Sequence, residues 1–149
     1  MKKILIVDDE KDIRILLSTI LKEEGYNCIL AGTVKEAEDI IENDFFDLVL
    51  LDISLDDKKK DGVYLLKQIK KFNKDIPVIM ISGHATIQVA VESVKLGAFE
   101  FLEKPFNTDR LLNFTKRAFE NLDLKKENKN LNREPKGYKA KISIINCYI

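Results

Sequence analysis

Runs of apolar residues alternate along the chain with longer stretches in which apolar residues recur every three or four positions. Continuous apolar runs are typical of parallel strands buried on both faces. They lie at 3–7, 27–31, 47–52, 77–82 and, more briefly, within 99–105. The intervening periodicity predicts amphipathic helices. The first of these helices would turn one apolar face inward, formed by Ile13, Leu16, Leu17, Ile20 and Leu21.

The alternation of five strands with five helices predicts the fold class. Strands joined by helical crossovers form a parallel sheet, and the helices cover both of its faces. Gly25 stands where the first helix should stop, and Thr33 with Glu36 forms a capping-box pattern that opens the second helix. The remaining helices are expected to begin at Gly62, to span 85–96 and to start near Thr108.

Polar residues follow the strands at their carboxyl ends. They are Asp8 and Asp9 after the first strand, Asp52 at the end of the third, Ser82 at the end of the fourth, and Lys104 after the fifth. In a parallel sheet these ends share one edge, and open α/β sheets bind their ligands there. We therefore expect these side chains to lie close together.

Two interpretations apply to the pair Asp8–Asp9. The acids can simply cap the helix that follows, which stabilises it by about 1 kcal/mol. With Asp52 nearby, however, unit charges 4 Å apart interact by about 4 kcal/mol at an effective dielectric constant of about 20. A cation is therefore expected among the three carboxylates. Hard oxygen ligands with open positions suit Mg²⁺, with Mn²⁺ as the alternative ion, and Lys104 supplies a further positive charge.

This set of groups suits phosphoryl transfer, which needs mainly positioning and neutralisation of charge. A carboxylate is a competent nucleophile for that reaction and gives an aspartyl phosphate. Asp52 is the expected nucleophile, while Asp8 and Asp9 hold the metal. Ser82 and Lys104 would contact the new phosphoryl oxygens.

Composition narrows the class of protein. The 149 residues are 45% hydrophobic and 34% charged, with a formal net charge of zero, as in many globular proteins. No apolar run reaches the roughly 20 residues of a membrane span, and the N-terminus does not read as a signal peptide. Two cysteines, Cys28 and Cys147, give no disulfide framework. We therefore expect a cytoplasmic protein without a membrane partner, and no dense basic patch marks nucleic-acid binding in the body.

The set Asp8–Asp9, Asp52, Ser82 and Lys104–Pro105 resembles the receiver domain of two-component response regulators. The resemblance covers about residues 2–120, and the matching positions occur in the family's order and strand context. It implies a flavodoxin-like sheet with the strand order 2-1-3-4-5. It also implies that a sensor histidine kinase, or a small phosphodonor, phosphorylates Asp52.

The resemblance also assigns roles to single residues. It implies that Mg²⁺ is bound by Asp9, Asp52 and the backbone carbonyl of Ser54, with Asp8 acting mainly through water. It implies that Ser82 and Phe101 are switch residues. Phosphorylation would then alter the surface formed by the fourth helix, the fifth strand and the fifth helix, and a homodimer would form through that surface.

Residues 80–106 look like the receivers of NtrC-type activators, and most like the NtrX subgroup. Gly62 comes ten residues after Asp52, where most receivers have a glycine at eight, and no proline lies between. This longer loop is similar to that of NtrX. Ser54 and His84 flank the path of a water attacking Asp52, and we interpret them as residues that tune the lifetime of the aspartyl phosphate.

The C-terminal part has a different composition. Residues 121–149 hold 7 Lys or Arg against 3 Asp or Glu, and Pro135 and Gly137 would end a fifth helix that extends into this part. We expect residues 1–120 to be the receiver and 121–149 to be a helix extension, a linker and a stub toward a missing output domain. No P-loop pattern and no helix-turn-helix follow, so DNA would be bound only through that absent domain.

Two other functions stay open. One is a degenerate receiver that binds a partner without being phosphorylated. The other is a Mg²⁺-dependent phosphohydrolase with an aspartyl nucleophile, but that class places a second acid two residues after the nucleophile, where this sequence has Ser54. The leading prediction is a regulatory domain, with at most self-phosphorylation from small donors and self-dephosphorylation.

Overall fold

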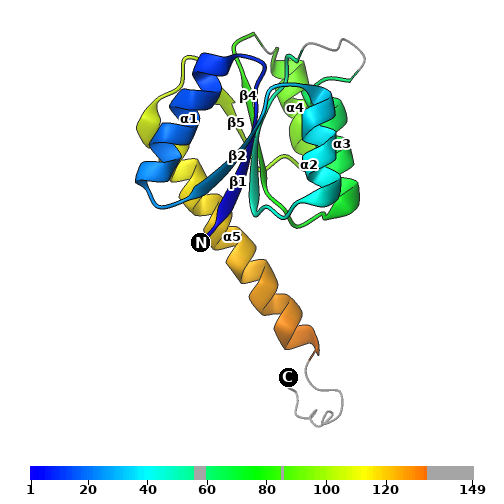
Figure 1. Cartoon of the computed structure of the whole chain (residues 1–149). Helices are drawn as coiled ribbons and strands as arrows, with labels where there is room; N and C mark the ends of the chain where they lie inside the picture. The colour runs from blue at the N-terminus through cyan, green and yellow to red at the C-terminus, as the bar shows by residue number, and fades with distance from the viewer. Residues whose placement is uncertain (56–59, 85, 134–149) are drawn as a thin grey trace. The chain divides into compact units, whose positions relative to one another are not determined.

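Five parallel strands form one sheet in the computed structural model, which describes residues 1–55, 60–84 and 86–133 (Figure 1). Their order is β2-β1-β3-β4-β5, which confirms the predicted fold. The strands are β1 (Lys3–Val7), β2 (Asn27–Ala31), β3 (Leu48–Asp52), β4 (Val78–Ser82) and β5 (Glu100–Glu103). The helices are α1 (Lys11–Glu23), α2 (Val34–Asn43), α3 (Gly62–Phe72), α4 (Ile87–Lys95) and α5 (Thr108–Arg133).

The central strands are the most apolar runs because both of their faces are covered. Every residue of β3 and β4 is buried, as are residues 4–7 of β1, whereas β2 at the edge is only partly buried. Val7 pairs with Leu51, and Leu51 pairs with Met80. This register brings the carboxyl ends of the three central strands side by side.

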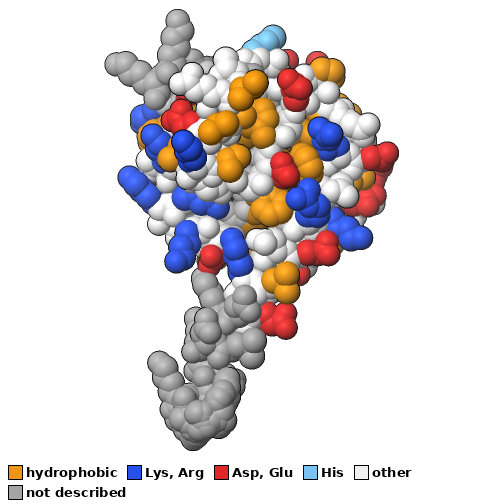
Figure 2. All heavy atoms as spheres, turned by 180° about the vertical axis from the view of Figure 1, so that it is seen from behind, with side chains coloured by type: hydrophobic (Ala, Val, Ile, Leu, Met, Phe, Trp, Pro, Cys, Tyr) orange, Lys and Arg blue, Asp and Glu red, His pale blue; other side chains and the backbone are white. Residues whose placement is uncertain are grey.

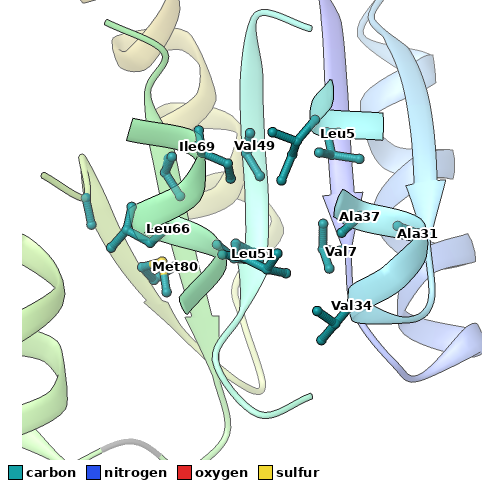
Figure 3. Packing of buried hydrophobic residues seen from close by; sticks show 14 of the residues in the cluster. Leu5, Val7, Ala31, Val34, Ala37, Val49, Leu51, Leu66, Ile69 and Met80 are labelled. Atoms are coloured by element: carbon teal, nitrogen blue, oxygen red, sulfur yellow. The ribbon is translucent and has the colours of Figure 1, made fainter. Parts of the chain in front are cut away.

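Helices cover both faces of the sheet, with α2, α3 and α4 on one face and α1 with the first turns of α5 on the other (Figure 1). On the first face Val49, Leu51 and Met80 of the strands pack in one cluster with Ala37 of α2 and Leu66 of α3 (Figure 3). Each large apolar side chain buried in this way stabilises the fold by about 1.5–3 kcal/mol. The packing of this core fixes where each strand ends along the direction of the sheet.

Local contacts at the helix ends agree with the sequence in part. Gly25 follows α1 with a positive φ of 93°, as expected of a helix stop. The Thr33 hydroxyl accepts the Glu36 N–H at 3.1 Å, but the Glu36 carboxylate accepts the N–H of Gly32 rather than that of Thr33. The predicted capping box is therefore wrong in its second half, because the carboxylate reaches one residue further back.

The fourth helix starts later than predicted, since α4 begins at Ile87. Thr86 is its N-cap, and the hydroxyl of Thr86 accepts the N–H of Val89 at 3.2 Å. A residue that caps a helix has extended backbone and cannot lie inside it. Ala85, which the sequence placed at the start of the helix, lies outside the described residues.

Two compact units divide the chain, residues 1–118 and 119–149, and α5 contributes to both. The first unit holds the whole sheet. In the second, α5 continues to Arg133. The linker and stub expected in 121–149 stay predictions, and residues 134–149 lie outside the described part. No helix within the described ranges is long and apolar enough to cross a lipid bilayer.

Gly62, the first residue of α3, lies against the end of β3. Its N–H donates to the carbonyl of Ile53 at 2.9 Å. A methyl group at position 62 would collide with the carbonyl oxygen of Asp52 and would lie 2.6 Å from the Cα of Ile53. A glycine is therefore required here by the close approach of two backbone segments.

Replacing Gly62 with alanine should lower the free energy of unfolding by about 3 kcal/mol, because the added methyl meets backbone that cannot yield. Urea denaturation measures the loss. Gly83→Ala is the matched control, since its methyl would come no closer than 3.7 Å to Lys104, and it should change stability by only about 0.5 kcal/mol. Equal losses in the two variants would contradict the close-approach explanation.

Candidate functional site

The carboxyl edge of the sheet gathers the polar residues that follow the strands. Asp8 directly follows β1, Asp52 and Ser82 are the last residues of β3 and β4, and Lys104 directly follows β5. The N–H of Lys104 donates to the carbonyl of Ser82 at 2.8 Å, which extends the pairing of β4 with β5 by one residue. The peptide bond between Lys104 and Pro105 is cis. The structure thus brings together the residues that the sequence placed at this edge.

The ammonium group of Lys104 contacts three carboxylates. Its Nζ lies 2.9 Å from Oδ2 of Asp8, 3.3 Å from Oδ2 of Asp52 and 3.3 Å from Oε1 of Glu10. Burial lowers the pKa of Lys104, but the bond to Asp8 and the charge of Asp52 outweigh that effect and raise it above its ordinary value. Lys104 therefore stays charged throughout the neutral range.

Asp8 is fixed by its backbone and by one carboxylate oxygen. Its N–H donates to the carbonyl of Ala31 at 3.2 Å, and its Oδ1 accepts the N–H of Glu10 at 2.8 Å. The second oxygen, Oδ2, is buried and forms an ion pair with Lys104. A buried oxygen of this kind can still accept a cation.

Asp52 is 3% exposed, and its surroundings act on the pKa of its carboxyl in opposite directions. Burial, and then the charge of Asp8, raise the pKa of its carboxyl to about 6, while Lys104 and the N–H of Ser54 act to lower it. The Ser54 N–H donates to Oδ1 at 3.3 Å. Oδ2 faces Lys104 at the same distance. The protein alone therefore neutralises the negative charge of the Asp52 carboxylate only in part.

The carboxylates fit a divalent cation. One oxygen from each of Asp8, Asp9 and Glu10 lies within 4.8 Å of the other two, and Asp9 and Glu10 are exposed to solvent. Hard oxygen donors with room for water are the environment that Mg²⁺ prefers. Glu10 was not among the predicted site residues, although it directly follows the Asp8–Asp9 pair in the sequence.

A cleft of about 780 Å³ opens above these acids. Asp9, Glu10, Asp52, Ser54, His84 and Lys104 form its polar wall, and Ile13, Leu16, Pro105 and Phe106 form an apolar lip. Leu16 was predicted on the buried face of the first helix, but it is 47% exposed because it lines this cleft. Ser54 and His84 both border the open space around Asp52.

Ser82 is buried at the end of β4, and its hydroxyl oxygen accepts the N–H of His84 at 3.2 Å. This bond ties the strand to the loop that leads toward α4. It uses only the acceptor capacity of the hydroxyl, so the O–H can donate to another group.

A family model, that of the response regulator receiver domain, matches residues 4–116. This range holds the sheet apart from Lys3 at the start of β1, and it holds every polar residue of the edge described above. The chain belongs to the response regulator receiver domain family.

Relatives place this receiver domain more closely. It is 46% identical over 125 residues to an NtrX-like response regulator of Rickettsia bellii, covering 84% of this chain and 26% of that protein. It is similar to the crystal structure of NtrX from Brucella abortus in complex with ADP, with a TM-score of 0.82 and 44% identity over 88% of this chain and 30% of that one. The predicted likeness to NtrC-type receivers of the NtrX subgroup is confirmed.

A third comparison concerns an isolated domain. The receiver is similar to the beryllofluoride-activated NtrC4 receiver domain dimer, with a TM-score of 0.76 and 45% identity over 82% of this chain and 99% of that one. Against the NtrX-like relative, by contrast, the chain spans about a quarter of that protein's length.

Phe101 lies on β5 of the receiver, apart from the carboxylates. It is half-buried, pairs with Met80 of β4 in the sheet, and packs against the hydrophobic cluster of Figure 3. One strand therefore carries Phe101 and leads directly into Lys104. The role of Phe101 as a switch residue stays a prediction.

The raised pKa of Asp52 predicts how stability depends on pH. Between about pH 4 and pH 6 the folded receiver binds a proton at Asp52 that the unfolded chain releases, so this group lowers stability as the pH rises through that range. Asp52→Asn removes the effect. In metal-free buffer the variant should gain about 3 kcal/mol over the wild type between the acidic and neutral limits.

Urea denaturation of both proteins at several pH values measures that difference. Asp47→Asn, at the opposite edge of the sheet where β3 begins, serves as a control for loss of one carboxylate. If the curves of wild type and Asp52→Asn run parallel from acidic to neutral pH, the explanation by burial and by Asp8 is wrong.

Proposed function

We propose that this chain is the phosphorylation-activated receiver of a response regulator, and that Asp52 accepts a phosphoryl group from a sensor histidine kinase. The arrangement around Asp52 carries the proposal. Its carboxylate is buried at the floor of an open cleft, and Lys104 lies 3.3 Å from Oδ2 while also pairing with Asp8. A nucleophile, a fixed cation and additional acids therefore meet at one accessible point.

Asp8, Asp9 and Asp52, with the carbonyl oxygen of Ser54, would hold Mg²⁺ or, in its place, Mn²⁺. When bound, the ion supplies the neutralisation of charge that phosphoryl transfer chiefly requires. The protein's own part is positioning. A carboxylate oxygen of Asp52 bonds to phosphorus as the bond from phosphorus to the donor's imidazole nitrogen breaks, and that nitrogen keeps the electron pair.

Two further side chains would bind the transferred group. Lys104 stays protonated and can pair with a phosphoryl oxygen, and Ser82 retains an O–H that can donate to another. Ser54 and His84 border the same space, and we propose that they tune how fast water removes the phosphoryl group. This is a regulatory use of phosphoryl transfer, limited to self-phosphorylation from small donors and self-dephosphorylation.

The lip of the cleft supports a protein as the donor. Ile13 and Leu16 of α1, with Pro105 and Phe106 after β5, present apolar surface directly beside the charged floor. An apolar centre with a polar surround is the usual composition of a protein interface. A kinase domain that seats on this lip would bring its phosphohistidine over Asp52.

The surface of α4, β5 and α5 would report the phosphorylation. Ser82 connects the site to the loop before α4, and β5 connects it to Phe101. In α4 the only fully buried residue is Ser93, whose hydroxyl has no partner among the described residues, while Ile87 is 85% and Val94 57% exposed. A helix held so weakly on its inner side can move when a charge is added nearby.

This surface also supports a homodimer of the phosphorylated form. Figure 2 shows hydrophobic side chains gathered in the upper half of one face, with Lys and Arg side chains beside and below them. On α5, Arg117 lies 5.6 Å from the ring centre of Phe114 and pairs with Glu100 of β5 at 3.5 Å. Exposed aliphatic side chains of α4 together with such Arg–aromatic pairs are common in protein interfaces.

We also propose which further domain the complete regulator contains. The NtrX-like relative is about four times as long as the matched region, so we propose that an output domain follows the receiver and regulates transcription by binding DNA. We place the protein in the cytoplasm, because two cysteines give no disulfide framework that would suit secretion.

Phosphorylation can be tested directly. Wild type and Asp52→Asn are incubated with Mg²⁺ and acetyl phosphate or phosphoramidate, and intact masses are recorded. The wild type should gain one phosphoryl group and the variant none, because only the variant lacks the nucleophilic oxygen. Chelation of the metal should suppress the gain in the wild type, since the acids then repel the donor.

Beryllofluoride separates the remaining outcomes. A wild type that gains no mass but binds beryllofluoride with Mg²⁺ hydrolyses its phosphoryl group quickly and is still a switch. A wild type that ignores both reagents is a degenerate receiver, and the proposed function is then wrong. Mass gain at another residue in Asp52→Asn would assign the nucleophile elsewhere.

The dimer is tested with Val94→Asp, which places a charge in the exposed apolar part of α4. The variant should accept the phosphoryl group as the wild type does but stay monomeric in light scattering after beryllofluoride treatment, because the carboxylate would be buried in the interface. Ile15→Asp, at a similarly exposed apolar position of α1, is the control and should still dimerise. Dimerisation of Val94→Asp would exclude this surface.

A further inference from the structure

The peptide unit that joins Asp8 to Asp9 is held by a side chain from α1. Its carbonyl oxygen, that of Asp8, accepts a hydrogen bond from Nη1 of Arg14 at 2.7 Å. β1 ends at Val7, so this carbonyl lies beyond the last residue of the strand. The guanidinium of Arg14 supplies the hydrogen-bond donor that a neighbouring strand would supply to a carbonyl within the sheet.

This bond controls the direction of two acids at once. The N–H of Asp8 is held by Ala31, and the carboxylate of Asp8 by the N–H of Glu10. The plane of the following peptide is then the remaining freedom, and rotating it moves the Cα of Asp9 and turns its carboxylate relative to that of Asp8. Fixing the carbonyl with Arg14 fixes the plane.

The guanidinium of Arg14 packs directly against Gly32, which we call its seat. A methyl group at position 32 would lie 2.7 Å from Nη1 and 2.9 Å from Cζ of Arg14, so the group rests directly on the glycine. The backbone of Gly32 does not need a positive φ, and its N–H is bound by the carboxylate of Glu36 at 2.7 Å. The three atoms nearest to such a methyl group all belong to the guanidinium of Arg14.

We infer that Arg14 is a positioning residue for the metal-binding acids: from its seat on Gly32 it orients the Asp8–Asp9 peptide so that both carboxylates face one cation. The inference rests on the proposed function, because it takes Mg²⁺ as the ion. Arg14 acts through backbone and does not itself touch the ion or the phosphoryl group. Partners of this kind behind a metal site commonly change affinity by about 10–100-fold when removed.

Two variants disturb the contact in different ways. Arg14→Gln removes the guanidinium and its charge. Gly32→Ala keeps the charge but displaces the group from its seat, and it asks for no new backbone conformation. Arg14→Lys retains one donor, and Lys22→Gln removes one positive charge from the same helix away from the site.

Mg²⁺ titration by calorimetry is the main measurement, with the chemical shift of the Asp9 amide in the metal-free protein as the second. Arg14→Gln and Gly32→Ala should both weaken Mg²⁺ binding by about 10-fold and move the Asp9 resonance. Arg14→Lys should recover part of the affinity, and Lys22→Gln should match the wild type. Circular dichroism checks that each variant is folded. If Arg14→Gln does not fold, the Mg²⁺ affinity of Gly32→Ala decides whether Arg14 positions the acids.

Other results would overturn the inference. Unchanged Mg²⁺ affinity in both variants removes any positioning role. Weakened binding in Arg14→Gln alone assigns the effect to charge rather than to orientation. If the wild type takes up both Mg²⁺ and the phosphoryl group while these variants equal it, only the inference fails; if the wild type takes up neither, the proposed function fails with it.

Discussion

One ammonium group holds this edge of the sheet together. Lys104 follows β5, yet it reaches Asp52 at the end of β3 and Asp8 beyond β1, crossing at least two strand spacings of about 4.8 Å each. Only a long, flexible side chain spans that distance. Small residues keep its path open, because Ser82 ends the intervening strand and Gly83 lies beneath the stem of the lysine, where an added methyl would be 3.7 Å from its Cβ.

The charge balance that results is incomplete, and that incompleteness suits the proposed chemistry. Three carboxylates share one lysine, and burial penalises the charge of Asp52 enough to raise its pKa to about 6. A fully neutralised cluster would stabilise the fold more, but it would attract neither a divalent cation nor a phosphoryl donor. The site therefore lowers stability at the carboxyl ends of strands β3 and β4, whose residues are all buried.

The sequence predicted what depends on local pattern and on chain order. Apolar runs located the strands, and the rule that parallel strands end at one edge placed Asp8, Asp52, Ser82 and Lys104 together. The contacts that it missed cross between elements. Neither the bond from Arg14 to the carbonyl of Asp8 nor the exposed position of Leu16 follows from periodicity, because each depends on how α1 lies over neighbouring loops.

The close approach of Gly62 to β3 has a consequence for how such domains diversify. The N–H of Gly62 donates to the carbonyl of Ile53, so one backbone hydrogen bond joins the two ends of the segment 53–62. Lengthening a closed loop costs little, since doubling its length adds only about 0.6 kcal/mol of closure entropy. Residues can thus be inserted between Ile53 and Gly62 without moving the carboxylate of Asp52. Related domains can therefore differ in the surface that this segment presents and still use the same phosphoryl-transfer chemistry.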